Sequence, residues 1–170
     1  MRKIIILSAL IFIAVNYIEA AERGGGGMEI TSPAFKHNEH IPAKYTCEGE
    51  DINPELIISG IPDGAKSLAL IMDDPDAPIG VWVHWVVFDI PLVSSIEENS
   101  VPGKLGITNS GRGNYHGPCP PSGTHRYFFK IYALDAQLNL KPGIPKGQLE
   151  KAMQGHILDS AELIGLYKKQ

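Results

Sequence analysis

Short apolar stretches separated by turn residues dominate the pattern of the chain from residue 28 onward. Most of its 18 glycines and 13 prolines stand between these stretches, which is typical of many short strands and few helices. The segments 90–104 and 106–124 are predicted to be loops from their composition. The pattern predicts strands over Leu56–Ile58, Ser67–Met72, Val81–Ile90, Arg126–Leu134 and Glu162–Tyr167.

The stretch Val81–Ile90 is apolar on both of its expected faces, which predicts a central strand in a sheet covered on both sides. Strict alternation puts Val81, Val83, Trp85 and Val87 on one face and Trp82, His84, Val86, Phe88 and Ile90 on the other.

Helical period is clear at Lys146–Gly155, where three apolar side chains share a face, Pro145 suits the opening turn and Gly155 the end. The predicted fold class is therefore mainly β, with two packed antiparallel sheets and one clear helix near the C-terminus.

The amino-terminal segment has the pattern of a secretory signal peptide. Met1-Arg2-Lys3 is positively charged, and the apolar run that follows is shorter than the ~20 residues that span a bilayer. Ala20 ends a passable cleavage site. We expect residues 1–20 to be a signal peptide, 21–27 a Gly-rich linker and 28–170 one folded domain, exported to the periplasm or secreted. An uncleaved membrane anchor is the alternative.

Charge and cysteine content narrow the classes of function. Without residues 1–20 the chain keeps 13 basic and 18 acidic residues, a net charge of −5. An acidic chain without a basic stripe is not typical of nucleic-acid binders. Cys47 and Cys119 are the two cysteines, and in an exported protein such a pair predicts a disulfide.

Polar residues gather where predicted strands meet Pro- and Gly-rich loops. Two prolines flank Asp76 in Asp74-Pro75-Asp76-Ala77-Pro78, so a rigid turn holds the carboxylates. An ordinary solvated turn is the alternative reading.

Two same-face pairs, Trp82 with His84 and His125 with Tyr127, present imidazoles beside aromatic rings. The irregular segment 115–123 suits presentation of backbone N–H groups to an anion. A satisfied core histidine and a pinned surface loop are the alternatives at these positions. We expect the imidazoles to become protonated beside a carboxylate and, with the Tyr127 hydroxyl, to bind a phosphate.

Three motifs in this order resemble the phosphatidylethanolamine-binding family, in its prokaryotic Raf-kinase-inhibitor-like branch. They are D-P-D-A-P at 74–78, W-V-H-W at 82–85 and G-P-C-P-P-S-G-T-H-R-Y at 117–127, and the resemblance extends over nearly all of 28–170. It implies a two-sheet sandwich with one anion-accepting pocket at one end. The predicted ligand-binding residues are Asp74, Pro75, Trp82, His84, Tyr115, Gly117, Cys119, Pro120, Pro121, His125 and Tyr127.

The resemblance implies a non-enzymatic binding protein without a cofactor, whose partner is a small anionic or phosphorylated ligand. Inhibition of a protease or kinase through the pocket rim is the alternative. The short spacing between Pro78 and Trp82, and an end soon after Tyr167 without the C-terminal helix of eukaryotic members, argue against regulated kinase inhibition. A homodimer is left open, and a membrane contact is expected only through an uncleaved signal.

Two other chemistries compete with this prediction. Ser122, with two histidines and two aspartates, supplies the ingredients of a hydrolase, yet it lacks the G-x-S-x-G elbow. His84, His116, His125 and Asp74 are a conceivable zinc shell, yet their spacing matches no familiar metal motif. We therefore predict neither catalytic residues nor a metal site.

Overall fold

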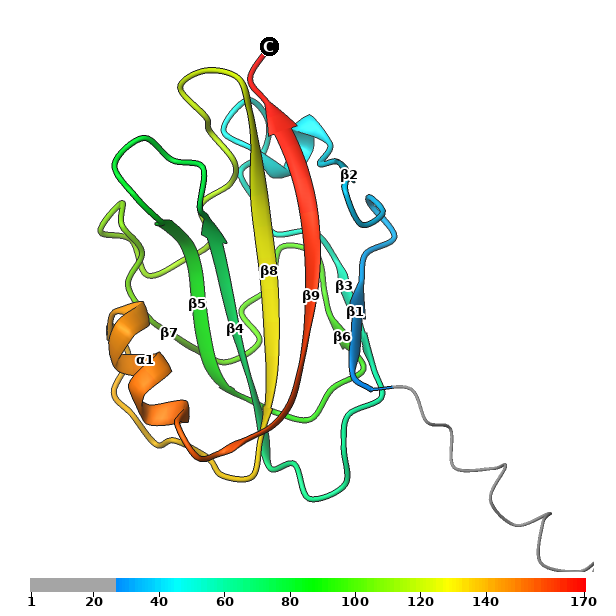
Figure 1. The fold of residues 1–170 in the computed structure, drawn as a ribbon, viewed down its shortest axis with the longest axis vertical. Helices are drawn as coiled ribbons and strands as arrows, with labels where there is room; N and C mark the ends of the chain where they lie inside the picture. The colour runs from blue at the N-terminus through cyan, green and yellow to red at the C-terminus, as the bar shows by residue number, and fades with distance from the viewer. Residues whose placement is uncertain (1–26) are drawn as a thin grey trace, which may run out of the picture.

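The longest apolar runs form the centre of a six-stranded sheet in the computed structural model, which describes residues 27–170 (Figure 1). The strand order in this sheet is β2-β9-β8-β4-β5-β7, and a second sheet has the order β1-β3-β6. The elements are β1 Glu29–Thr31, β2 Glu39–His40, a 3-10 helix at Ala43–Tyr45, β3 Leu56–Ser59, β4 Ser67–Asp74, β5 Trp82–Ile90, β6 Ser95–Ile96, β7 Lys104–Leu105, β8 Thr124–Leu134, α1 Lys146–Met153 and β9 Ile157–Lys168.

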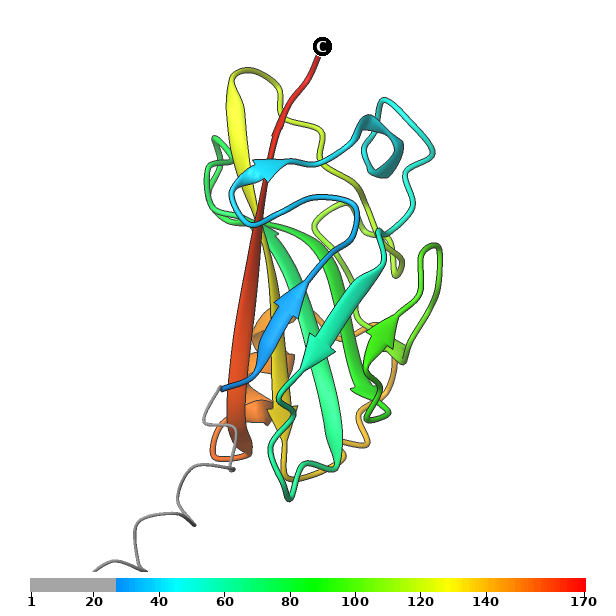
Figure 2. The same ribbon diagram turned by 90° about the vertical axis from the view of Figure 1, so that its right-hand side faces the viewer.

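The large sheet is covered on both sides, as the two-faced apolar pattern predicts. The small sheet covers one face, and α1 lies on the other (Figure 2). The inter-sheet core includes Leu70, Met72, Trp85, Phe129 and Ile131. The helix face has a smaller core, built from Ala69, Ile71, Val83, Val86, Phe88, Leu134, Ile144, Leu149 and Met153.

All five principal strands and the helix are present, with ends that differ from the predicted ones. Strand β9 begins at Ile157, five residues before the predicted start at Glu162, and α1 ends at Met153, before Gly155. The helix begins at the predicted Lys146, directly after Pro145. The prediction of an uninterrupted loop over 90–104 is wrong because it contains β6 and the first residue of β7. Two-residue strands are too short to show any alternation.

Strict alternation along β5 is also wrong, because two register shifts interrupt its pairing with β4. Met72 pairs with Trp85 but Asp73 pairs with Val83, so His84 is an extra residue at a β-bulge. The other shift lies between the pairs of Leu68 and Leu70. As a result Val83 packs on the helix face while Trp85 packs between the sheets. A bulge redirects side chains in this way, and it places His84 at the end of the sandwich.

The predicted disulfide between Cys47 and Cys119 is confirmed. Their Cα atoms are 5.4 Å apart, and the bond closes 72 residues of sequence separation. A loop of this length corresponds to about 4 kcal/mol of stabilisation in the loop-entropy description. The Cys47 N–H also donates a hydrogen bond to the carbonyl of Pro118, 3.1 Å away. The bond therefore fixes the segment before β8 to the segment after the 3-10 helix.

The predicted signal peptide at 1–20, and residues 21–26 of the predicted linker, lie outside the described residues. From residue 27 to residue 170, no helix has the length and apolar character needed to cross a membrane.

Candidate functional site

A cavity of about 280 Å³ opens at the end of the sandwich where β4 ends and β5 begins. The β4–β5 connection, the segment before β8 and the C-terminus lie at this same end (Figures 1 and 2). Asp74, Ala77, Pro78, Ile79, Trp82, His84, Cys119, Pro120, Pro121 and Tyr127 line the cavity. Most of these side chains are apolar, and none of them is a lysine or an arginine.

Asp74 is the last residue of β4, and both of its carboxylate oxygens accept a hydrogen bond. Oδ1 accepts the Asp76 N–H at 2.8 Å, and Oδ2 accepts the His125 Nδ1–H at 2.7 Å. His125 is buried and packs behind Asp74, outside the cavity lining. The imidazole therefore orients the carboxylate, and a ligand would meet Asp74 first.

The turn after Asp74 is held to β8 by Asp76. Its carboxylate accepts hydrogen bonds from Arg126 Nε at 2.9 Å, Nη2 at 2.8 Å and the backbone N–H at 3.0 Å. The Arg126 side chain lowers the pKa of Asp76 to about 2. This pair fixes the proline-rich wall of the cavity relative to the strand that carries Tyr127.

His84 presents a neutral imidazole to the cavity. Its Nδ1–H donates to the carbonyl of His116 at 2.6 Å, which leaves Nε2 as the ring nitrogen without a partner within residues 27–170. Burial is the main reason that the pKa of His84 is lowered to about 4. The expectation that His84 would be protonated is therefore wrong, because desolvation of the charge outweighs the nearby Asp74 carboxylate.

Tyr127 supplies a fully buried hydroxyl at the cavity whose proton has no acceptor among the described residues, although the Cys119 N–H lies close enough to its oxygen to act on the pKa of the phenol. Its side chain is 0% exposed, and its ring packs edge-on against His84 with centroids 5.2 Å apart. Burial raises the pKa of this phenol, so it stays protonated and able to donate. Buried hydroxyls normally have partners, which makes this group a candidate ligand contact.

The irregular segment before β8 forms one wall of the cavity with Cys119, Pro120 and Pro121. Two residues near its start, Tyr115 and Gly117, hold the segment in place. Tyr115 donates its hydroxyl to the carbonyl of Tyr45 at 2.9 Å, and Gly117 donates its N–H to Asp51 Oδ1 at 2.6 Å.

The structure brings seven of the eleven predicted site residues to the cavity lining: Asp74, Trp82, His84, Cys119, Pro120, Pro121 and Tyr127. Pro75, Tyr115, Gly117 and His125 are not part of it. Tyr115, predicted to bind the ligand, packs edge-on against Trp85 in the core. Ala77, Pro78 and Ile79 line the cavity and were missed. Ala77 and Pro78 belong to the D-P-D-A-P turn, which is the signal for them, whereas Ile79 follows that motif.

The competing chemistries find no support in this geometry. Within residues 27–170, no three His, Cys, Asp or Glu side chains are grouped so that they could hold a metal ion. The Ser122 side chain is exposed and does not line the cavity.

Comparison with known proteins agrees with the fold and with the motifs. The family model for phosphatidylethanolamine-binding protein matches residues 31–168. A UPF0098 protein of Methanothermobacter thermautotrophicus is 52% identical over 84% of this chain and 99% of its own length. Another UPF0098 protein, from Pyrococcus horikoshii, is 46% identical over 98% of this chain and 88% of its own.

Two crystal structures are similar to this chain. A phosphatidylethanolamine-binding protein homologue from Chlamydia trachomatis has a TM-score of 0.82 and 43% identity, covering 85% of this chain and 99% of its own. YbcL of E. coli, described as a new member of the mammalian family, has a TM-score of 0.79 and 27% identity, over 85% and 100% of the two chains. The chain belongs to the phosphatidylethanolamine-binding protein family.

Proposed function

We propose that this chain is a non-enzymatic binding protein whose cavity accepts the head group of a small phosphorylated ligand. The observation that carries the proposal is the buried Tyr127 hydroxyl, which lines the cavity without an acceptor for its proton among the described residues. A buried hydroxyl left unpaired costs about 1 to 3 kcal/mol. A phosphate oxygen that accepts its hydrogen bond removes this penalty.

The neutral His84 ring favours a ligand that carries a proton. Because Nδ1–H is engaged with the His116 carbonyl, Nε2 faces a ligand as an acceptor. A singly ionised phosphate has one P–OH group to donate to Nε2 and other oxygens to accept from Tyr127. A fully ionised phosphate lacks that donor and would take up a proton on binding.

The Asp74 carboxylate restricts the ligand further. No lysine or arginine lines the cavity to offset its negative charge, so a ligand of high negative charge is disfavoured. A cationic group in the same ligand would compensate Asp74 directly. The best match is therefore a phosphate ester that also bears an amine, such as phosphoethanolamine, with its apolar portion toward Pro120, Pro121 and Trp82.

The geometry argues against catalysis at this site. Covalent catalysis needs a nucleophile activated by a base or by a lowered pKa. Cys119 is in a disulfide, and burial raises the pKa of Tyr127. Neither residue is an activated nucleophile, so binding without turnover is the function that we propose.

Inhibition of a protease or kinase is a second candidate, favoured by the mouth of the cavity. Ile79 is 82% exposed and Val81 is 52% exposed, although both are large apolar residues. Exposed apolar residues beside a cavity are typical of protein-binding surfaces. In this alternative the ligand pocket and the docking surface share the 74–82 connection.

Calorimetric titration with phosphoethanolamine at pH 6 tests the proposed ligand class. Tyr127→Phe removes only the hydroxyl, and we expect a 10- to 100-fold weaker affinity, the scale of about 1.5 to 3 kcal/mol for a hydrogen bond to a charged group. Tyr132→Phe, a half-buried tyrosine on the same strand outside the cavity, is the matched control and should bind as wild type. Equal affinity in the two variants, or no binding to wild type, would refute the proposal.

A further inference from the structure

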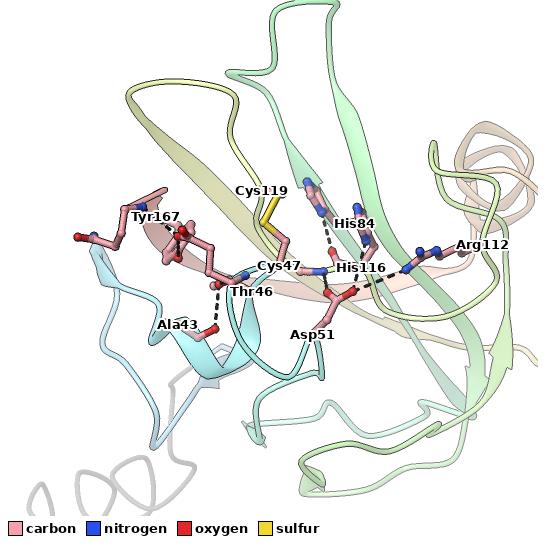
Figure 3. Close-up of a disulfide and its surroundings, with 12 residues drawn as sticks. Ala43, Thr46, Cys47, Asp51, His84, Arg112, His116, Cys119 and Tyr167 are labelled. Atoms are coloured by element: carbon pink, nitrogen blue, oxygen red, sulfur yellow. Dashed lines mark hydrogen bonds and ion pairs between the residues drawn. A yellow bond between two sulfur atoms is a disulfide. The ribbon is translucent and has the colours of Figure 1, made fainter.

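One peptide unit joins His84 to a carboxylate outside the cavity. The carbonyl of this unit, from His116, accepts the His84 Nδ1–H at 2.6 Å. Its N–H, from Gly117, donates to Asp51 Oδ1 at 2.6 Å. The Asp51 carboxylate is therefore linked through the 116–117 peptide to the His84 imidazole, which faces the cavity. Both hydrogen bonds are short. Figure 3 shows Asp51 beside the His116 segment, with dashed lines from that segment to Asp51 on one side and to His84 on the other.

The chain is built to permit this close approach. A Cβ atom at Gly117 would lie 2.8 Å from Asp51 Oδ1 and 2.5 Å from the carbonyl oxygen of Tyr45, so any larger residue would push the peptide away. Asp51 itself has φ of 56°, a left-handed conformation that few residue types adopt readily. The His116 N–H donates back to the His84 carbonyl at 3.0 Å, which fixes the two segments side by side.

We propose that Asp51 is a positioning residue that acts on His84 through the 116–117 peptide, holding Nδ1 as the donor and Nε2 as the acceptor that a ligand meets. The part of this inference that concerns ligand affinity rests on the proposed function. The part that concerns the imidazole does not. Asp51 does not line the cavity and would not touch a ligand there.

The physical reason is polarisation of the peptide. A negative charge at the N–H end increases the negative partial charge on the carbonyl oxygen at the other end, and consecutive hydrogen bonds strengthen one another in a low-dielectric interior. A stronger acceptor at Nδ1–H raises the basicity of Nε2, in the way that carboxylates orient histidines in many sites. Nε2 then binds a P–OH donor more tightly.

Other charged and titratable groups also face His84. Asp74 comes from β4 and Tyr127 from β8, and the His116 ring stacks on the His84 ring with centroids 5.8 Å apart. Arg112 Nη1 and His116 Nδ1 each lie 3.7 Å from Asp51 Oδ2. Asp51 is the one among these groups that is hydrogen-bonded to the same peptide unit as His84. Its charge also raises the pKa of His84 directly through space, so the tautomer of His84 is the readout specific to the route through the peptide.

Two substitutions separate the charge of Asp51 from its role as an acceptor. Asp51→Asn keeps an oxygen that accepts the Gly117 N–H, and asparagine also tolerates the left-handed conformation, so this variant should fold. Asp51→Ala removes both the charge and the acceptor. The readout is the pair of imidazole ¹⁵N chemical shifts of His84, followed from pH 7 to pH 4, because these shifts report which ring nitrogen carries the proton.

We expect Asp51→Asn to keep the Nδ1–H tautomer but to lower the pKa of His84 further. Its affinity for phosphoethanolamine should fall about three- to tenfold, as for one weakened hydrogen bond. In Asp51→Ala the shifts should move toward a mixture of the two tautomers. Asp89→Asn is the matched control, since Asp89 has φ of 51° and accepts backbone N–H groups from Leu138 and Asn139. It should leave His84 unchanged.

Unchanged His84 shifts and an unchanged pKa in Asp51→Asn would overturn the inference, whether or not Asp51→Ala folds. The two proposals fail in different ways. If Tyr127→Phe leaves phosphoethanolamine binding intact while Asp51→Asn still alters His84, the proposed function is wrong and the action of Asp51 on His84 stands. If Tyr127→Phe weakens binding and Asp51→Asn alters neither His84 nor affinity, the reverse holds.

Discussion

Asp73 and Asp74 are neighbours on β4, both are almost fully buried, and their side chains serve opposite faces of the large sheet. Asp73 lies on the helix side, where Lys130 Nζ is 2.9 Å from Oδ1 and Lys146 Nζ contacts Oδ2. Asp74 lies on the cavity side, where its partners are the imidazole of His125 and a backbone N–H.

The difference lies in how completely each environment satisfies its polar groups. Two lysines, one of them at the first residue of α1, saturate the Asp73 carboxylate and tie the helix to the sheet. Around Asp74, a titratable partner, the neutral His84 ring and the unpaired Tyr127 hydroxyl leave hydrogen-bonding capacity unused. The cluster around Asp73, whose polar groups are all paired, has the character of a structural contact between helix and sheet. The cluster around Asp74, whose polar groups are not all paired, has the character of a ligand-binding site.

The largest effect should follow from breaking the cluster around Asp73. Asp73→Asn leaves two lysine charges facing the buried position without a counter-charge, and removing one partner of a buried ion pair costs about 3 to 5 kcal/mol. We expect the lower end of this range, because both lysines remain partly exposed. Urea denaturation at pH 7 measures the loss in free energy of unfolding.

Asp74→Asn is the matched control for that experiment. Histidine can become neutral near physiological pH whereas lysine cannot, so this variant should lose about 1 kcal/mol, the scale of one hydrogen bond. It should nevertheless weaken phosphoethanolamine binding, while Asp73→Asn should not. Equal destabilisation by the two substitutions would contradict the contrast between a structural and a ligand-binding carboxylate.

Lowering the pH should reduce the free energy of unfolding by a similar amount, through protonation of His84 on the cavity side. The pKa of His84 is about 4 in the folded protein and about 6.5 in an unfolded chain. The unfolded chain therefore takes up the proton first, so stability is complete above pH 6.5 and falls as the pH drops toward 4. The total loss from this group is about 3 kcal/mol.

Denaturation at pH 7.0, 5.5 and 4.5 in wild type and in His84→Asn isolates this contribution. Asparagine retains an N–H donor near the His116 carbonyl but does not titrate, so the variant should show the shallower dependence on pH. His156→Asn, at an exposed position, serves as control and should follow the wild type. Parallel curves for wild type and His84→Asn would show that His84 is not neutral in the folded state.

The apolar pattern was sufficient for the sheet framework, and the family resemblance supplied seven of the ten residues that line the cavity. Long apolar runs specify central strands because their burial on two faces leaves few other arrangements, and rigid turns such as 74–78 hold their side chains at strand ends. The disulfide was predicted because the chain is expected to be exported, where paired cysteines form disulfides, and because both cysteines lie in loops at one end. These predictions did not depend on knowing which side chains touch one another in the fold.

What could not be predicted depends on register and burial. The bulge at His84 is a shift of a single residue in pairing, and no alternation rule reveals it before the partner strand is known. The charge of His84 was misjudged for the same reason, since burial and not the sign of its neighbour determines its pKa. The contact from Asp51 to Gly117 spans 66 residues of sequence, and nothing local to Asp51 indicates it.

The smallest effect is expected at the rim, where the Arg126–Asp76 pair joins the two walls of the cavity. Arg126→Met removes the guanidinium but keeps the backbone N–H that also binds Asp76. Exposed ion pairs contribute little to stability, so the urea concentration at the midpoint of unfolding should stay close to that of the wild type. Because the pair aligns the 74–78 turn, phosphoethanolamine affinity should still fall about twofold, as for a fraction of one hydrogen bond.

Calorimetry at 50 mM and 500 mM salt separates alignment from direct attraction. Arg126 does not line the cavity, and charges separated by more than about 10 Å are screened at 0.1 M salt. If the arginine only aligns the turn, the ratio of wild-type to Arg126→Met affinity stays nearly constant between the two salt concentrations. A tenfold or greater loss at low salt that disappears at high salt would mean that Arg126 attracts the ligand itself. The cavity would then have the fixed positive charge that its lining lacks, and the preference for a ligand bearing its own cation would no longer follow.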